Sequence, residues 1–414
     1  MGISFSIISL GCPRNLVDSE RIASEFRKKG CKLQEDVTGS DVLIINTCAF
    51  IEDAKRESID VILKAIDAKK EGRIKKIIVA GCLSERYGKE LAKELGEVDE
   101  FRGVLDFKDN GAVSKLTPAH YAYVKISEGC VNRCSYCVIP YLKGPYKSRT
   151  IRSIKDEVAG LVKKGAREIV LVGQDTSLYG IDLYKNKKLA CLLRDLARNA
   201  GDAWIRVLYL HPANLDKEVI KVIRDNENIC RYVDLPLEHI NDNVLSRMKR
   251  RAKKKEIVSL LEFIRKEIPG VALRTSLIVG FPGETEREFR ELADFVNEME
   301  FERLGVFKYS REEGTPAYNY EGQISDRIIN RRFDEIMSLQ QRISARVNER
   351  FKGRTLKVLV EEKKEGCYLA RTEYDAPEVD GMVYVKGKGL SIGNFADVRI
   401  TDTYEYDLAG EVVR

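Results

Sequence analysis

The stretch "EGCVNRCSYCVIPYLKGPYKSR" at residues 128–149 places three cysteines within eight positions, followed by a basic loop that contains Gly and Pro. Cys130, Cys134 and Cys137 have the spacing C-x3-C-x2-C. Thiolates favour zinc or iron–sulfur clusters over hard cations. A structural zinc site takes four protein ligands, and no fourth Cys or His follows nearby. The three thiols therefore fit a 4Fe–4S cluster, with one iron left open for a small chelating molecule; a zinc knuckle is the alternative.

The surrounding chain, from about Tyr121 to Ser310, alternates short apolar runs with helical segments. The runs are AYVKIS, EIVLVG, WIRVLYL, YVDLPL, LRTSLIVG and RLGVFKYS. Six consecutive βα units predict a full or partial barrel, whose chemistry belongs at the carboxyl ends of its strands. The cysteine stretch follows the first of these strands.

A C-x3-C-x2-C motif after the first strand of a barrel resembles the radical S-adenosylmethionine (SAM) superfamily. The resemblance implies that SAM binds the open iron, and that one electron from the cluster splits it to give a 5′-deoxyadenosyl radical. It also implies SAM contacts at Tyr136, at Gln174 in "LVGQDTSLYG", and at Arg274 and Ser276 in "RTSLIVGFPGET". The family often has Gly-Gly-Glu where this chain has Gly173-Gln174-Asp175, which leaves Asp175 in doubt as a contact. Alternatively, Tyr136 packs against the cluster and the strand residues only fill the barrel.

The first hundred residues form a separate α/β pattern. "SFSIISL" (4–10), "DVLIINT" (41–47) and "KKIIVAG" (75–81) read as buried parallel strands with helical segments between them. Cys12, Cys48 and Cys82 each directly follow one of these strands. Because the carboxyl ends of parallel strands share one edge, where ligands bind, we expect the three thiols to converge. We predict a second three-thiolate cluster; three buried, inert cysteines are the alternative.

The C-terminal part has a different pattern. Residues 326–353 predict a long charged amphipathic helix, and the tail from Phe351 shows short strands with Gly-rich turns, typical of a small OB-like barrel. The predicted fold class is α/β, with an N-terminal parallel α/β domain, a central partial β/α barrel and a small all-β barrel of the TRAM or OB kind. The expected boundaries are 1–115, 116–325, a helical linker at 326–350, and 351–414.

The two sets of three cysteines, together with this order of domains, resemble the methylthiotransferases, a branch of the radical SAM enzymes. That resemblance implies a transferase with two 4Fe–4S clusters, in which the second cluster supplies sulfur. One SAM would methylate that sulfur, and another would generate the radical that opens an inert C–H bond. "SLGCPRNLVDSE", "DLPLEHINDNVLSRMKR" and "YSREEGTPAY" resemble the RimO type, which modifies the β-carbon of an aspartate on the twelfth small-subunit ribosomal protein. Methylthiolation of a tRNA adenosine beside the anticodon, and a non-catalytic iron–sulfur protein that binds RNA or ribosomes, are the alternatives.

Charge and composition bear on partners and location. The formal net charge is +6, and residues 351–414 hold ten Lys/Arg and twelve Asp/Glu, so this tail carries 10 − 12 = −2. An acidic barrel suits a basic ribosomal protein better than RNA phosphates. No apolar run approaches ~18 residues, so no membrane span is expected. Ten cysteines in a chain of 414 residues favour a reduced, cytoplasmic setting. We also expect a monomer, an electron donor such as flavodoxin or ferredoxin, and a free or subunit-assembled ribosomal protein as substrate.

The remaining cysteines and histidines lack matching partners in the sequence. We interpret all of them as structural: Cys31, Cys191, Cys230, Cys367, His120, His211 and His239. His211 and His239 lie near strand ends, so lining of the active site stays open for these two.

Overall fold

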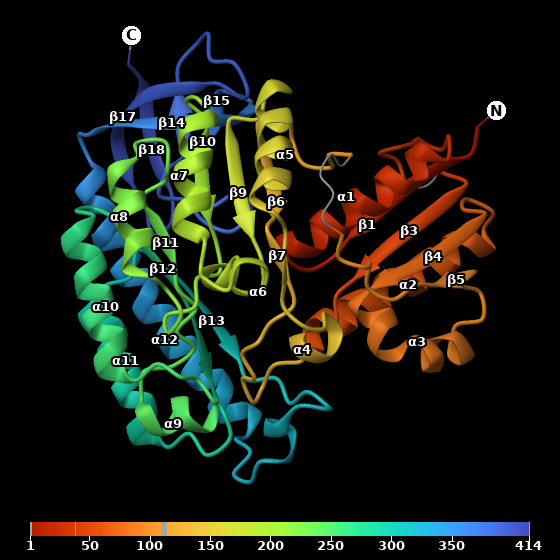
Figure 1. Ribbon diagram of the computed structural model, residues 1–414, viewed down its shortest axis with the longest axis horizontal. Coiled ribbons are helices and arrows are strands. Elements are labelled where there is room, and N and C mark those ends of the chain that lie inside the picture. Colours follow the sequence, from red (N-terminus) through yellow and green to blue (C-terminus); the bar gives the residue numbers. More distant parts are fainter. Residues whose placement is uncertain (1, 38, 109–113, 414) are drawn as a thin grey trace.

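The chain folds into an N-terminal α/β sheet, a central partial β/α barrel and a C-terminal closed β-barrel, as the expected fold class requires (Figure 1). The structure is a computed structural model that describes residues 2–37, 39–108 and 114–413. Among these residues, no helix is long and apolar enough to cross a membrane.

The N-terminal sheet is parallel throughout and has the order β2-β1-β3-β4-β5. The three predicted strands are its central ones, and two-residue strands flank them. The strands are β1 (Ser4–Ser9), β2 (Lys32–Leu33), β3 (Val42–Thr47), β4 (Lys76–Gly81) and β5 (Glu100–Phe101). The helices are α1 (Pro13–Lys28), α2 (Glu52–Lys70) and α3 (Cys82–Glu94). Residues of β3 and β4 are buried on both faces, which is why these strands read as continuous apolar runs.

The central barrel contains all six predicted strands. They form two parallel sheets, ordered β10-β9-β6 and β11-β12-β13, which a single bridge from Ile205 to Ile229 joins. The strands are β6 (Tyr121–Lys125), β9 (Glu168–Val172), β10 (Trp204–Val207), β11 (Tyr232–Asp234), β12 (Ala272–Val279) and β13 (Arg303–Lys308). Over the part of the chain that is described, β6 and β13 do not pair, so the barrel stays open.

Helices cover the outside of this barrel, and short elements lie at its ends. The long helices are α5 (Ile151–Lys163), α7 (Leu189–Asn199), α8 (Lys217–Asp225), α10 (Lys254–Glu267) and α11 (Glu286–Met299). The short elements are β7 (Ser127–Glu128), α4 (Ile139–Leu142), β8 (Lys147–Ser148), η1 (Thr176–Leu178), α6 (Ile181–Tyr184), α9 (Asp242–Arg247) and η2 (Pro316–Asn319). Their apolar faces and the inner strand residues form one large core.

A long helix leads from the central barrel to the C-terminal barrel, as predicted. It is α12 (Asp326–Asn348), continued by η3 (Glu349–Phe351), and it buries Ile336 and Ile343 in the central core. The closed barrel has the strand order β14-β15-β16-β18-β17. Its strands are β14 (Thr355–Lys364), β15 (Cys367–Thr372), β16 (Val383–Lys386), β17 (Phe395–Thr403) and β18 (Leu408–Val412), the last of which the sequence reading did not anticipate.

The C-terminal barrel seals the amino ends of the central strands. Glu168 at the start of β9 is fully buried, and it pairs with Arg206 of β10 (Nε–Oε1, 2.7 Å) and Arg371 of β15 (Nη2–Oε2, 2.5 Å). The ring of Trp204 lies 4.7 Å from that of Phe395. Because chemistry in such barrels sits at the carboxyl ends, this small barrel caps the end opposite the expected site (Figure 1).

The docking of the C-terminal barrel changes how the negative net charge of residues 351–414 is interpreted. Asp375 pairs with Arg303 (2.5 Å), Asp380 lies 3.7 Å from Arg274, and Glu378 accepts a hydrogen bond from Tyr121 (2.6 Å). Several of the acidic side chains counted in the sequence therefore face the central barrel. The net charge of −2 does not describe the outer surface, and it lends little support to a basic partner.

Candidate functional site

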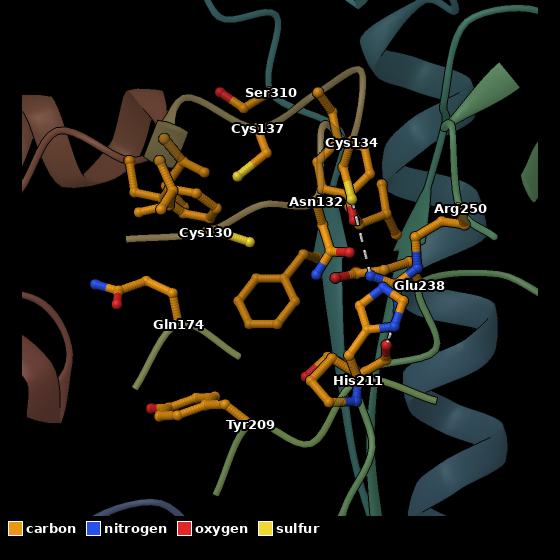
Figure 2. A pocket seen from close by; sticks show the side chains of 18 of the residues that line it. Cys130, Asn132, Cys134, Cys137, Gln174, Tyr209, His211, Glu238, Arg250 and Ser310 are labelled. Atoms are coloured by element: carbon orange, nitrogen blue, oxygen red, sulfur yellow. Dashed lines mark hydrogen bonds between the residues drawn. The ribbon is translucent and has the colours of Figure 1, made fainter. Parts of the chain in front are cut away.

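The barrel triad, Cys130, Cys134 and Cys137, lines a cavity of about 250 Å³ at the carboxyl ends of the central strands (Figure 2). The loop that carries it starts at Gly129, which has a φ of +77°. A Cβ there would lie 2.4 Å from the carbonyl oxygen of Pro145, so the turn requires glycine. The amide of Ser135 donates to the carbonyl of Met248 (3.0 Å), which ties the loop to the barrel wall.

These thiols suit a soft metal group. Burial raises the pKa of Cys130 to about 11, and burial together with the neighbouring Cys134 raises the pKa of Cys137 further. Without a metal, Cys130 and Cys137 hold their protons at neutral pH, and a bound metal would displace those protons. All ten cysteines are free, so no disulfide competes for the donors. Across residues 2–37, 39–108 and 114–413, no three His, Cys, Asp or Glu side chains are arranged to hold a single metal ion.

The structure brings together most of the residues predicted to contact SAM. Tyr136, Gln174 and Ser276 line the cavity with the barrel triad. Arg274 does not: its Nη1 lies 2.9 Å from Asp234, and its Nε faces Asp380 of the C-terminal part. Asp175, the doubtful member of its triplet, caps η1 and accepts hydrogen bonds from Asn132 and Asn214 (2.7 and 2.8 Å).

The N-terminal triad, Cys12, Cys48 and Cys82, gathers at the carboxyl edge of the N-terminal sheet. Cys12 is the N-cap of α1, Cys48 follows β3, and Cys82 begins α3. A Cβ on Gly11 would lie 2.9 Å from Cys48 Sγ, which puts that thiol beside the Cys12 loop. Charges on Cys48 and Cys12 both act on Cys82. The structure therefore brings the three thiols together, as the positions at the strand ends predict.

The three thiols of this triad titrate differently. Burial raises the pKa of Cys82 to about 12, and burial also raises that of Cys48. Burial works in the same direction on Cys12, but the charge and hydrogen bond of Arg14 outweigh it and lower the pKa of Cys12. Cys12 is thus the most acidic thiol of its triad.

The cavity extends from the barrel triad to the N-terminal sheet. Arg14, Phe50 and Ile51 line it, and they stand two or three residues beyond Cys12 and Cys48. The guanidinium of Arg14 crosses the gap and lies 4.3 Å above the ring of Tyr209, which follows β10. The barrel triad and the residues just beyond Cys12 and Cys48 therefore line the same space between the two parts of the molecule.

Comparisons with known proteins assign each part of the chain. Residues 4–103 match the uncharacterized protein family UPF0004, residues 124–296 the radical SAM superfamily, and residues 353–413 the TRAM domain. The chain is 46% identical to the ribosomal protein uS12 methylthiotransferase RimO of Thermoanaerobacter sp. (strain X514), over 98% of this chain and 99% of that protein. The chain belongs to the RimO-type radical SAM methylthiotransferases. Identity to RimO of Bacteroides fragilis (strain ATCC 25285) is 44%, over 99% of both chains.

Solved structures agree with this RimO-type assignment at the level of fold. The radical SAM methyltransferase TsrM of Kitasatospora setae, with cobalamin and a 4Fe–4S cluster bound, superposes with a TM-score of 0.55 at 16% identity. That match covers 77% of this chain and 74% of TsrM. Membership in the radical SAM superfamily implies SAM and one 4Fe–4S cluster as cofactors.

A buried ionic cluster, which sequence reasoning missed, joins the two parts of this RimO-type chain. Lys125 Nζ lies 2.5 Å from Asp18 and 2.6 Å from Glu128, while Lys143 Nζ lies 2.9 Å from Asp18. Burial works to raise the pKa of Asp18, but the two lysines outweigh it and lower the pKa to about 2. The sequence signal for this cluster was Asp18, which falls on the apolar face of the helical pattern "NLVDSE".

A second interdomain contact lies at the edge of the cavity. Glu312, which follows β13 and is 1% exposed, pairs with Arg86 of α3 (2.6 Å) and Lys55 of α2 (3.1 Å). Arg86 also donates to the carbonyl of Glu313 (2.7 Å), and Ser310 donates to Glu312 (2.7 Å). We call the set Glu312, Arg86 and Lys55 the interdomain clamp. It holds the sheet with the N-terminal triad against the barrel with the other triad.

Two cavity residues of the barrel adopt backbone conformations that side chains rarely take. Tyr209 has a φ of +64° and Glu238 a φ of +71°. Such strained positions persist where the surrounding structure fixes them, and they cluster at functional sites.

His211 also lines the cavity; burial, Arg250 and Arg251 lower its pKa to about 2, so it is neutral.

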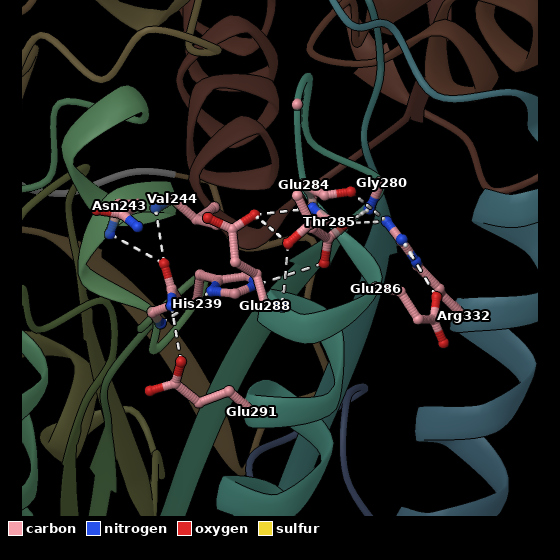
Figure 3. Close-up of polar contacts among 12 residues, drawn as sticks. His239, Asn243, Val244, Gly280, Glu284, Thr285, Glu286, Glu288, Glu291 and Arg332 are labelled. Carbon is pink, nitrogen blue, oxygen red and sulfur yellow. Dashed lines mark hydrogen bonds and ion pairs between the residues drawn. The ribbon is translucent and has the colours of Figure 1, made fainter.

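The end of β12 is held by a buried polar cluster outside the cavity (Figure 3). Glu284, which is buried, accepts from the amide of Gly280 and pairs with Arg332 of α12 (2.9 Å). His239 Nε2 lies 3.3 Å from the same carboxylate, so this histidine supports the loop and does not line the cavity. A capping box of Thr285 and Glu288 starts α11 directly afterwards. The "GFPGET" segment is therefore fixed in place beside Ser276.

Proposed function

We propose that this chain transfers a methylthio group from a SAM-dependent donor to the β-carbon of an aspartate on ribosomal protein uS12. The observation that carries the proposal is an interdomain cavity lined by the barrel triad and by Arg14, Phe50 and Ile51, which closely follow two cysteines of the N-terminal triad. Support for the substrate comes from the relatives, which are uS12 methylthiotransferases at 42–46% identity.

We assign one 4Fe–4S cluster to the barrel triad and a second to the N-terminal triad. When bound, the clusters and SAM supply the electron, the radical and the sulfur that an inert C–H bond requires. The chain contributes position. Each triad offers three free thiols and leaves room for one further ligand, which is the donor set that a SAM-binding cluster and a sulfur-holding cluster both need.

The remaining cavity residues bind and orient SAM in this proposal. Tyr136 offers an aromatic face and Ser276 a hydroxyl to the cavity, and Gln174 offers an amide whose Nε2 already donates to Glu128. The interdomain clamp closes the cavity edge and excludes water. The neutral His211 adds no charge to the cavity, so the cationic sulfonium of SAM meets no extra repulsion there.

The setting of the reaction is part of the proposal. Free cysteines throughout and a ribosomal substrate favour the cytoplasm, and a small flavodoxin- or ferredoxin-type protein would deliver the electron. We propose that the chain acts as a monomer on uS12, either free or within the assembled small subunit.

Anaerobic reconstitution with iron and sulfide, followed by incubation with SAM, a reductant and uS12, tests this function. We expect 5′-deoxyadenosine and a uS12 mass gain equal to replacement of H by SCH3 on one aspartate. The same mass gain on tRNA, with uS12 unchanged, would favour the adenosine substrate. Full cluster loading without 5′-deoxyadenosine would favour a non-catalytic iron–sulfur protein.

A further inference from the structure

Arg14 stands in the first turn of α1 and reaches across to the barrel. Its Nε donates to Cys12 Sγ (3.4 Å), and its guanidinium carbon lies 4.3 Å above the ring of Tyr209. One hydrogen bond and one stacking contact thus fix the plane of the guanidinium. Arg14 lines the cavity, and within the described residues no hydrogen bond from either of its Nη groups is seen.

Among the described residues, this half-buried arginine lacks the carboxylate partner that the deeply buried arginines have. Arg206 and Arg371 pair with Glu168, Arg303 with Asp375, and Arg332 with Glu284. Within residues 2–37, 39–108 and 114–413, no carboxylate oxygen lies within 4.0 Å of the Arg14 guanidinium. Glu128 acts on it from a distance, but its two oxygens accept from Lys125 and Gln174.

Arg14 comes from the helix that Cys12 caps, so it reaches the cavity from the N-terminal side. Its charge acts on Cys12 and Cys48 of the N-terminal triad. A different arginine, Arg250, faces the barrel triad, with Nη1 4.0 Å from Cys134 Sγ and Nη2 donating to the carbonyl of Pro236. Arg14 therefore lies in the cavity lining between Cys12 and Tyr209 of the barrel, on the side where the reacting carbon must lie if sulfur comes from the N-terminal triad.

We propose that Arg14 binds the side-chain carboxylate of the target aspartate and so selects that residue. A planar guanidinium with two free Nη groups matches a carboxylate in a bidentate pair. The β-carbon of an aspartate is bonded directly to that carboxylate carbon, so holding the carboxylate places the reacting carbon between the triads. This assignment rests on the proposed function, because it takes an aspartate of uS12 as the substrate.

A binding experiment with variants on both sides tests the pair. The cluster-loaded chain with SAM, without reductant, is titrated with unmodified uS12 and with uS12 whose target aspartate is replaced by asparagine. We expect Arg14→Gln to weaken binding of uS12 by about 10- to 100-fold, and to leave binding of the asparagine form unchanged. Arg14→Lys should restore part of the affinity, because it keeps the charge but loses the fork. Arg27→Gln, at the exposed far end of the same helix, is the matched control and should change neither affinity.

Each other outcome has a distinct meaning. Equal losses for both uS12 forms would overturn the proposal and make Arg14 a structural link between the two parts. A parallel loss of SAM affinity in Arg14→Gln would also overturn it, because the fork would then serve the SAM carboxylate. If uS12 did not bind to the unchanged chain, that result would contradict the proposed function itself. Cluster content and thermal unfolding, measured for each variant, check that the variant is folded.

Discussion

The two cysteine triads are assembled in different ways. The barrel triad comes from one loop of eight residues, whereas the N-terminal triad comes from three strand ends that are 48 − 12 = 36 and 82 − 48 = 34 residues apart. The loop needs one turn at Gly129 to aim its thiols, but the dispersed triad needs a whole folded parallel sheet. A local motif is thus robust to changes elsewhere, while the second site depends on the fold that assembles it.

The triads also differ in their cationic neighbour. Arg14 hydrogen-bonds Cys12 and keeps its outer edge free toward the cavity. Arg250 faces Cys134, and its Nη2 donates to the backbone carbonyl of Pro236. On the N-terminal side, Arg14 therefore keeps donors for an anion. This asymmetry is consistent with substrate on one side and SAM on the other.

The largest expected effect comes from removing one thiol from each triad. Cys134→Ala should lower 5′-deoxyadenosine formation by about 100-fold or more, because even outer-shell changes at metal sites cost about 10- to 100-fold. Cys48→Ala should leave that formation within a few-fold of the unchanged chain, yet abolish methylthiolated uS12. Chromatography of the nucleoside and mass spectrometry of uS12 report the two steps. Equal loss of both products in both variants would contradict the division of labour between the triads.

A smaller effect should follow from loosening the interdomain clamp. Glu312→Gln leaves Arg86 without its carboxylate and Lys55 with only Glu52 of its own helix, so the sheet with the N-terminal triad is held less firmly against the barrel. Since small misplacements cost up to about 100-fold in rate, we expect about tenfold less methylthiolated uS12 per 5′-deoxyadenosine. Glu313→Gln is the control, because Glu313 is exposed and offers the clamp only its backbone carbonyl. An unchanged ratio in Glu312→Gln would show that the clamp does not align the triads.

A backbone change at Gly81 should affect the N-terminal triad and leave the barrel triad intact, which the free energy of unfolding and the iron content would show. Gly81 precedes Cys82 with a φ of +93°, and a Cβ there would lie 2.3 Å from Asn46 Oδ1. Gly81→Ala should lower the free energy of unfolding by about 2 kcal/mol and reduce iron by half, through loss of the N-terminal site alone. Gly88→Ala, in α3 with open space around it, should leave both measurements unchanged or slightly improved. Iron loss from the barrel site in Gly81→Ala would contradict the dependence on the sheet.

The smallest effect concerns the acidity of the thiols in metal-free protein. Arg14 lowers the pKa of Cys12 while burial raises those of Cys48 and Cys82. Thiolate is the reactive form and its fraction rises as pH passes the pKa, so iodoacetamide should label Cys12 at lower pH than its two partners. Arg14→Gln should shift the Cys12 labelling curve to higher pH. Peptide mass spectrometry over a pH series measures this, and simultaneous labelling of all three would contradict the assigned environments.

Much of this architecture was predictable because it depends on local patterns. Apolar runs predicted the strands, and the carboxyl ends of those strands predicted where each triad gathers and placed the barrel triad and three of the four candidate SAM contacts at the cavity. Strand β18 escaped notice because "LAGEV" contains Ala and Gly, which have low strand propensity. Alternation along β12 could not show that Arg274 pairs with Asp234 and faces Asp380, because Asp380 lies more than a hundred residues away. The docking of the acidic tail was hidden for the same reason.

Iron and acid-labile sulfide per chain, measured after reconstitution, test the central claim most directly. The unchanged chain should hold twice the iron and sulfide of a variant with Cys12, Cys48 and Cys82 replaced by Ala, and twice that of a variant with Cys130, Cys134 and Cys137 replaced. Each triple variant should keep the cluster of the other triad. Iron for a single cluster in the unchanged chain, or zinc in place of iron at either triad, would contradict the account.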